Sequence, residues 1–173
     1  MGSGTSGLYS STSGGSQPYA ETYSVVQSEK AKDMKDKEIY DPQRGYFHNP
    51  TATSLENAHN GRYFTIDGKK AEGLFMYVLD KAGNLIIGKR CNPNNSHKRS
   101  PHPTLIGGKN PEVQCAGMIE FRKGRIYSVD IQSGHFRPNT KSLEKVDKIL
   151  SDLYKKNPGL FNPKSQWSKR DEQ

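Results

Sequence analysis

Apolar residues are scarce in this chain. Only 31% of its 173 residues are hydrophobic, whereas 17 are glycine and 10 are proline. The sequence has no apolar run of about 18 residues, so no membrane-spanning helix is expected. The N-terminus lacks a charged segment followed by an apolar stretch, so no secretory signal peptide is expected. With so few apolar residues, a hydrophobic core cannot extend over the whole length, and we expect it to begin near Arg62.

Motifs for metals and nucleotides are also missing. The two cysteines, Cys91 and Cys115, do not have CxxC spacing, so a structural zinc site is not expected. Whether these cysteines pair or stay free is left open. His97 and His102 lie five residues apart in a polar segment with no third ligand beside them. The sequence has no Walker loop, no GxGxxG and no HExxH motif, and we therefore expect neither a metal ion nor a cofactor.

Positive charge is the strongest feature of the composition. Lysine and arginine number 26 against 18 aspartates and glutamates, which gives a net charge of +8. Between Lys89 and Arg125 the sequence has eight basic residues and two glutamates. Such a segment favours an anionic partner: nucleic acid, an acidic protein or a membrane surface. The alternative is that these charges only keep the chain soluble and protect edge strands from aggregation.

Composition divides the chain into three parts. Residues 1–18 are rich in glycine and serine, and we expect them to form a flexible, disordered linker. Residues 19–61 mix charged and loop-forming stretches with short helical ones, and we expect an N-terminal arm. Residues 62–173 hold most of the apolar runs and are expected to form the main domain of a monomer.

Hydrophobic patterning predicts an α+β fold for that main domain. LFMYVL and LIIGKR, separated by DKAGN, predict one β-hairpin, and CAGMIEF and RIYSVDI, separated by RKG, predict a second. The polar stretch CNPNNSHKRSPHP between them is expected to be a long loop. Apolar residues at helical spacing predict a helix within 140–159, capped by Asn139 or Thr140 and ended by Pro158. This order of elements predicts a small antiparallel β-sheet with a C-terminal amphipathic helix.

Two histidines flank the second hairpin. His102 precedes Pro103 in a stiff, extended context, and His135 follows Gly134, which is expected to let the chain turn sharply. Imidazoles titrate near neutral pH, so two of them can act as general base and general acid on a phosphodiester. Taken singly, either histidine is more readily explained as structural than as catalytic. A hairpin returns the chain towards its start, so we expect His102 and His135 to converge on one phosphate.

Other side chains complete this candidate site. Arg137 is expected to neutralise the charge that develops on phosphorus, and Thr104 to orient the substrate. The substrate is expected to contact basic, aromatic and hydroxyl side chains: Lys98, Arg99, Lys109, Lys123, Arg125, Tyr127, Ser133 and Phe136.

The segment from His102 to Pro138 resembles a known module. Its pattern is H-x-[ST]-[LF]-[LI]-x-G, then AG, then a glycine-containing hairpin, then SGH[YF]-x-P. The module is found in the C-terminal toxin domains of bacterial polymorphic toxins and in plant calmodulin-binding proteins of the IQM type. This chain has His-Pro-Thr where His-Ser-Ser is commoner, and Thr104 keeps the hydroxyl. It has no IQ motif, so calmodulin binding is not implied.

The resemblance implies an interbacterial toxin, delivered from a larger secreted carrier into the cytoplasm of a target bacterium. Such a toxin is accompanied by a cognate immunity protein, here expected to be acidic. Together with the histidines and the charge, this predicts a metal-independent ribonuclease acting on tRNA or another structured RNA. A second hypothesis is an NAD-dependent ADP-ribosyltransferase, for which Arg90, His102, Glu120 and Tyr127 are available. A third is a non-catalytic basic binding module.

Overall fold

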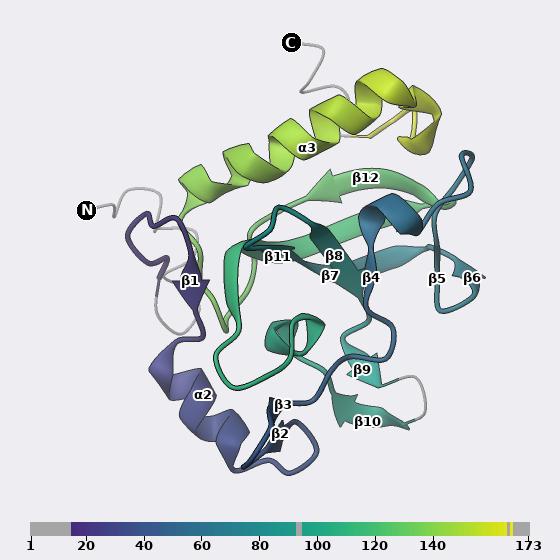
Figure 1. The fold of residues 1–173 in the computed structure, drawn as a ribbon. Coiled ribbons are helices and arrows are strands. Elements are labelled where there is room, and N and C mark those ends of the chain that lie inside the picture. The colour runs from purple at the N-terminus through teal and green to yellow at the C-terminus, as the bar shows by residue number, and fades with distance from the viewer. Residues whose placement is uncertain (1–14, 93–94, 166, 168–173) are drawn as a thin grey trace.

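The computed structural model describes residues 15–92, 95–165 and 167 of the chain. Most of the predicted linker, residues 1–14, lies outside the described residues. The fold is mixed α+β, with antiparallel sheets, short helices and a longer C-terminal helix (Figure 1). The predicted fold class is therefore confirmed. No helix in the described ranges is long and apolar enough to cross a membrane.

An antiparallel sheet of six strands forms the centre of the molecule. The strand order is β1–β11–β7–β8–β4, and β12 pairs with β11 further along the edge that β1 also occupies. The two predicted hairpins are confirmed, as β7 with β8 and β11 with β12. The strands are β1 (Tyr23–Ser24), β4 (Thr53–Ser54), β7 (Gly73–Asp80), β8 (Leu85–Gly88), β11 (Glu112–Arg122) and β12 (Arg125–Val129).

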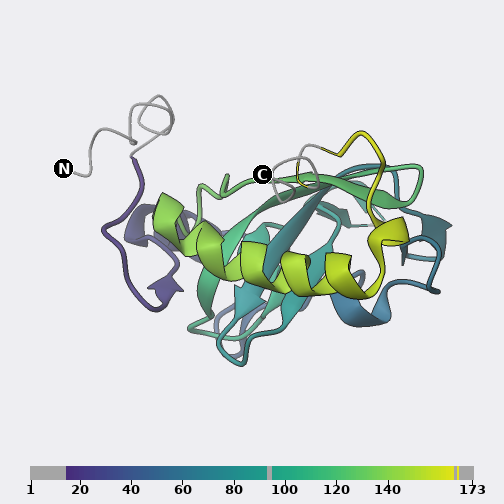
Figure 2. The same cartoon turned by 90° about the horizontal axis from the view of Figure 1, so that it is seen from above.

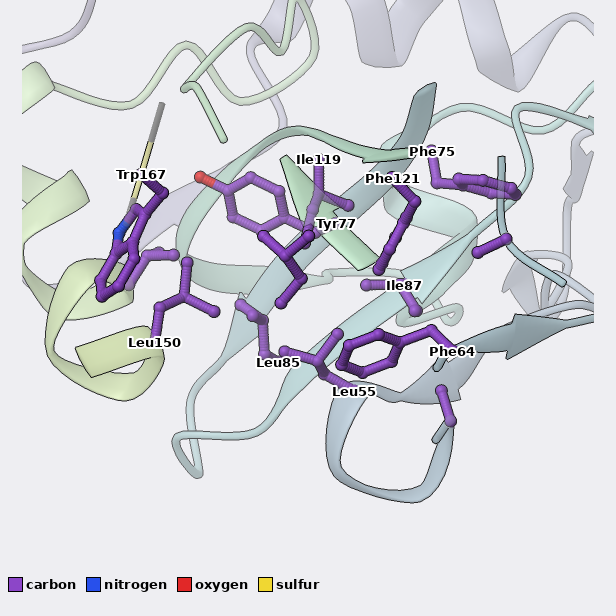
Figure 3. Packing of buried hydrophobic residues seen from close by; sticks show 14 of the residues in the cluster. Leu55, Phe64, Phe75, Tyr77, Leu85, Ile87, Ile119, Phe121, Leu150 and Trp167 are labelled. Atoms are coloured by element: carbon purple, nitrogen blue, oxygen red, sulfur yellow. The ribbon is translucent and has the colours of Figure 1, made fainter. Parts of the chain in front are cut away.

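The predicted amphipathic helix is α3 (Leu143–Lys156), which lies lengthwise across one face of the sheet (Figure 2). Alternate residues of β7 and β11 point to this face and pack against the apolar side of α3. Figure 3 shows Tyr77 of the sheet and Leu150 of the helix within this first core. As predicted, Asn139 supplies a cap: its side chain accepts a hydrogen bond from the Lys141 amide in the short helix η3 (Thr140–Ser142).

The N-terminal arm covers the opposite face of the sheet. Its elements there are α2 (Gln27–Met34), β2 (Tyr40–Asp41) and β3 (Gly45–Tyr46), and the short helix η2 (His102–Leu105) joins them. Apolar side chains from the arm, from η2 and from the sheet form a second core, including Tyr23, Val25, Ile39, Tyr40, Tyr46, Met76, Val78, Leu105 and Phe136. Through β1 and β4 the arm also supplies two edge strands of the sheet.

The segment expected to be a long polar loop contains three short elements. β9 (Cys91–Asn92) pairs with β10 (Asn95–Arg99), and η2 follows. The loop prediction was wrong for these residues, because paired backbone groups form a ribbon even where the sequence is polar. The other short elements are η1 (Leu55–Asn57), β5 (Thr65–Ile66), β6 (Lys69–Lys70) and η4 (Pro158–Leu160).

Candidate active site

His135 lies in the loop between β12 and α3, and this loop is fastened to the N-terminal arm. The main-chain oxygen of His135 accepts a hydrogen bond of 2.8 Å from the Val26 amide. The imidazole Nε2 donates a hydrogen bond of 2.8 Å to Oδ2 of Asp33 in α2. Only 8% of His135 is exposed and none of Asp33. The two residues therefore form a buried imidazole–carboxylate pair between segments 102 residues apart in sequence.

Asp33 has two further partners, which keep its carboxylate ionised. The Tyr46 hydroxyl donates a hydrogen bond of 2.7 Å to Oδ2, and Arg99 forms an ion pair of 3.4 Å with Oδ1. Burial alone would raise the pKa of Asp33, but hydrogen bonds from His135 and Tyr46 and the charges of His135 and Arg99 hold it below its usual value. Burial and the neighbouring Asp33 raise the pKa of Tyr46, so its hydroxyl remains a donor.

A second carboxylate, that of Glu29, lies one helical turn before Asp33 on the same face of α2. Its Oε1 is 3.7 Å from His135 Nε2, and its Oε2 is 3.8 Å from the Arg137 guanidinium. The guanidinium also donates a hydrogen bond of 2.9 Å from Nε to the main-chain oxygen of Gly134. Arg137 thus lies beside His135, as the sequence interpretation requires.

His102 is the first residue of η2, the short helix whose Leu105 packs in the second core. Its Nε2 donates a hydrogen bond of 2.8 Å to the main-chain oxygen of Gly117 on β11. Burial lowers the pKa of His102 to about 4; the bond to Gly117 only partly offsets this, and the charges of His135 and Arg90 lower it further. His102 is therefore neutral at neutral pH.

Both imidazoles use the same ring nitrogen to bond the protein. In His102 and in His135 the hydrogen-bonded atom is Nε2. Within the described residues no buried side-chain nitrogen or oxygen lacks a hydrogen-bond partner. The Nδ1 atoms receive no hydrogen bond from the described residues, so they are the ring nitrogens left for a substrate.

Gly117 lies between His102 and the start of the His135 loop and contacts both. Its oxygen accepts the bond from His102, and a Cβ at this position would overlap the main-chain oxygen of Asp130, where the His135 loop begins. One carboxylate oxygen of Asp130 accepts hydrogen bonds from the Met118 and Gln132 amides. The AG of the module thus has a physical role, since only glycine lets the loop approach β11 this closely.

Thr104 does not have the role expected of it. Its hydroxyl is buried and donates a hydrogen bond of 2.7 Å to the Pro101 oxygen, and its main-chain oxygen accepts one from Asn49. The chain does turn at Gly134, since residues 134–136 form a turn in which the Arg137 amide donates a hydrogen bond of 2.7 Å to the Ser133 oxygen. The φ of Gly134 is not positive, however, and a Cβ there would meet open space, so the turn does not require glycine. Thr104 is therefore a residue that fastens η2, and Gly134 leaves room beside His135.

The predicted substrate-binding residues fall into separate groups. Arg99 lies at the Asp33 carboxylate, Ser133 caps the His135 loop by accepting a hydrogen bond from the Phe136 amide, and Lys109 is exposed beside β3. Phe136 is fully buried in the second core, so its expected stacking on bases was wrong. The Lys98 side chain lies outside the described residues.

The remaining candidates lie elsewhere on the sheet. Lys123 and Arg125 lie at the β11–β12 turn, close to β5 and β6 and away from α2 (Figure 1). The Arg122 guanidinium lies 3.4 Å from the ring centroid of Tyr127 and covers one face of that ring. Arg122 also forms an ion pair of 2.9 Å with Glu120. The hairpin therefore does not bring these residues to the histidines.

Both cysteines are free, Cys91 on the surface and Cys115 in the first core, where burial raises its thiol pKa to about 11. Among the described residues no group of three or more histidine, cysteine, aspartate or glutamate side chains is arranged to hold a metal ion.

Sequence reasoning missed the carboxylates of the site. Glu29, Asp33 and Tyr46 all come from the arm, and α2 is polar along most of its length. The spacing of Glu29 and Asp33, four residues apart, was the available signal, since it places both on one helix face.

No protein-family model, no curated protein and no solved structure matches this chain.

Proposed function

We propose that this chain is the toxin domain of an interbacterial toxin and acts as a metal-independent ribonuclease on structured RNA. The observation that carries the proposal is the hydrogen bond between His135, in the SGHF motif, and the fully buried carboxylate of Asp33. A carboxylate behind an imidazole fixes the tautomer and stabilises the ring when it carries a proton. The toxin assignment is supported by the motif resemblance and by the net charge of +8.

His135 is the general acid in this mechanism. Asp33 holds Nε2, so Nδ1 is the atom that gives a proton to the leaving 5′-oxygen as the phosphorus–oxygen bond breaks. Asp33 touches no reacting atom and is a positioning residue. Tyr46 and Arg99 keep it ionised, which makes it an effective partner for an imidazolium.

His102 is the general base. Since its pKa is about 4, its ring is neutral at neutral pH, and Nδ1 can accept the proton of a ribose 2′-hydroxyl. The 2′-oxygen then bonds to phosphorus, and the products are a 2′,3′-cyclic phosphate and a free 5′-hydroxyl. Two titratable groups can act as a paired acid and base when their surroundings favour the protonated form of one and the neutral form of the other.

The cations around the pair suit a phosphate. Arg90 influences His102 electrostatically, Arg99 pairs with Asp33, and Arg137 lies beside His135. The planar guanidinium matches phosphate oxygens in pairs, which the point charge of lysine does not. Arg137 is the nearest group to neutralise charge developing on phosphorus. Thr104 is given no role in substrate binding.

Delivery from a carrier and inhibition by an acidic immunity protein belong to the same proposal. A domain that destroys RNA in the cytoplasm needs an inhibitor in the cell that makes it. The basic surface supports an acidic inhibitor, because complementary charge speeds encounter.

The test is cleavage of total RNA by the purified chain, with EDTA and without NAD. We expect wild type to cleave and His135→Ala to lose on the order of 100-fold or more of the rate. Asp33→Asn should lose activity through the rate constant of the chemical step, with little change in RNA affinity. Arg125→Gln, at the distant turn, is the matched control and should cleave as wild type does.

Two outcomes reject the ribonuclease. Consumption of NAD without RNA cleavage supports the ADP-ribosyltransferase, and neither activity supports the non-catalytic module. A His135→Ala protein with wild-type melting temperature and full cleavage also rejects the mechanism.

A further inference from the structure

The helix α2 is attached to the molecule without a buried apolar side chain. Its two apolar residues, Ala31 and Met34, are exposed, and Asp33 is its only buried residue. Within the described part of the chain, neither of the two cores includes a side chain of α2. Most helices in proteins are stabilised by packing of an apolar face. The docking of α2 therefore depends on polar contacts.

The closest of these contacts converge on Asp33. Its carboxylate accepts hydrogen bonds of 2.8 Å from His135 and 2.7 Å from Tyr46, and it pairs with Arg99 at 3.4 Å. A buried charge cluster of this kind contributes little net stability, because its formation removes charged groups from water. When α2 leaves as a whole, Asp33 and its partners regain water. The free-energy cost of undocking is therefore small.

The other side chains of α2 are held at longer range or at the surface. Lys30 donates a hydrogen bond of 3.0 Å to the exposed Asn110 side chain. The Glu29 carboxylate lies 3.7 Å from His135 and 3.8 Å from Arg137. Exposed polar pairs contribute little to stability, so these contacts add little to the docking of α2.

Both ends of α2 are fastened to the body of the molecule. Tyr23 and Val25 before the helix are buried, and so are Ile39 and Tyr40 after it. Movement is therefore confined to residues 26–38. A helix of eight residues, whose N-cap Val26 supplies no side-chain hydrogen bond, is not stable by itself, so undocking and unwinding of α2 occur together.

We infer that α2 is a hinged lid over His135, and that its undocking switches the candidate site off by carrying Asp33 away from the imidazole. The docked helix gives His135 its buried carboxylate, and the undocked segment leaves the ring without it. Activity then follows the docked fraction, and a partner that binds the undocked segment lowers it. The consequence for catalysis rests on the proposed function, whereas the movement does not.

The first experiment measures amide hydrogen exchange of the full chain by mass spectrometry. The hydrogen-bonded amides of α2 should be protected about tenfold less, or weaker still, than those of β7, β11 and α3, because the lid opens locally. Ala31→Gly should lower protection in α2 about fivefold, since glycine weakens an exposed helix position. Val26→Ser should raise it by about the same factor, because serine supplies the missing cap.

Lys148→Gly is the matched control, since it places glycine at an exposed position of α3. It should leave the protection of α2 unchanged, and Ala31→Gly should leave that of β11 unchanged. Equal protection of α2 and β11 in wild type overturns the inference. So does a loss of protection that Ala31→Gly causes equally in α2 and β11.

The second experiment holds the lid open with Ala31→Pro. Proline breaks the helix at this exposed position, which is not part of the candidate site. The ¹⁵N resonances of the His135 imidazole should change, and RNA cleavage should fall about tenfold or more, as in Asp33→Asn. Unchanged protection of β11 and α3 verifies that the rest of the chain is folded, and Ala31→Gly replaces this variant if it is not. Unchanged His135 resonances in folded Ala31→Pro contradict the lid.

The two proposals fail separately. If wild type cleaves RNA and α2 is protected as strongly as β11, the lid is rejected and the ribonuclease remains. If α2 exchanges locally and Ala31→Pro alters the His135 resonances in a protein that cleaves no RNA, the lid is supported and the ribonuclease is rejected.

Discussion

At the scale of residues, burial of His102 makes stability depend on pH whatever reaction the protein performs. Its pKa of about 4 in the folded chain lies below the ordinary value of 6.5. The unfolded chain therefore takes up the proton first as pH falls, and stability decreases from about pH 6.5 downwards through pH 4. The loss amounts to roughly 3 kcal/mol. Urea unfolding at several pH values should show it in wild type and show much less in His102→Gln.

Comparable pH slopes in wild type and in His102→Gln would mean that another group titrates in this window. Asp33 does not, because its pKa is lowered and its contribution is lost only below its ordinary value of 3.8.

Of the two module glycines near the site, only Gly117 should be sensitive to replacement by alanine. At Gly117 a Cβ would overlap the main-chain oxygen of Asp130, so Gly117→Ala should destabilise the fold by about 2 kcal/mol. At Gly134 a Cβ would meet open space, so Gly134→Ala should fold as wild type does. Urea midpoints measure both. A Gly117→Ala protein as stable as Gly134→Ala would show that the loop does not need this close approach.

Single residues also mark the limit of sequence-based prediction. His102, His135 and Arg137 were candidates because they belong to a spaced motif. For Asp33 the sequence offers only its spacing from Glu29, because its burial arises only when α2 packs on the His135 loop. Phe136 was misassigned because its burial, too, depends on tertiary packing. An aromatic side chain can stack on a ligand only if it is not buried in the core, and Phe136 is fully buried.

At the scale of elements, hydrophobic patterning predicted the strands and the helix that are long enough to have one apolar and one polar face. The hairpins β7–β8 and β11–β12 and the helix α3 follow from periods of two and 3.6 residues. The two-residue strands β1 and β4 exist only because an edge of the sheet is there to pair with them. Tertiary pairing of this kind leaves no periodic signal in the sequence.

The segment before β1 also has a structural role. Gln17 lies in the stretch expected to be linker, yet its amide and side chain donate hydrogen bonds to the oxygens of Arg137 and Phe136, and its oxygen accepts one from Asn139. Deleting residues 1–14 removes none of these bonds and should leave the melting temperature unchanged. Deleting residues 1–17 should lower it by a few degrees and weaken any activity that depends on Arg137. Equal melting temperatures for both deletions, by calorimetry, would contradict this role.

At the scale of the whole molecule, charge is unevenly placed. Arg99 and Lys109 lie beside the arm, whereas Lys123 and Arg125 lie at the far turn. Replacing Arg99 and Lys109 by glutamate should slow association with the proposed acidic immunity protein about tenfold at low salt. The same change at Lys123 and Arg125 should have little effect. Stopped-flow association rates decide this, and an equal slowing by both pairs would place the inhibitor elsewhere.

In the proposed mechanism one histidine takes a proton from a ribose 2′-hydroxyl while the other, held by Asp33, protonates the leaving oxygen. The most direct measurement uses an RNA that the protein cuts at one bond, with a single 2′-deoxy nucleotide placed at that bond. Cleavage there should fall by on the order of 100-fold or more, and products of the unmodified RNA should end in 2′,3′-cyclic phosphate. Undiminished cleavage of the deoxy substrate, or products ending in a 3′-hydroxyl, would contradict the account.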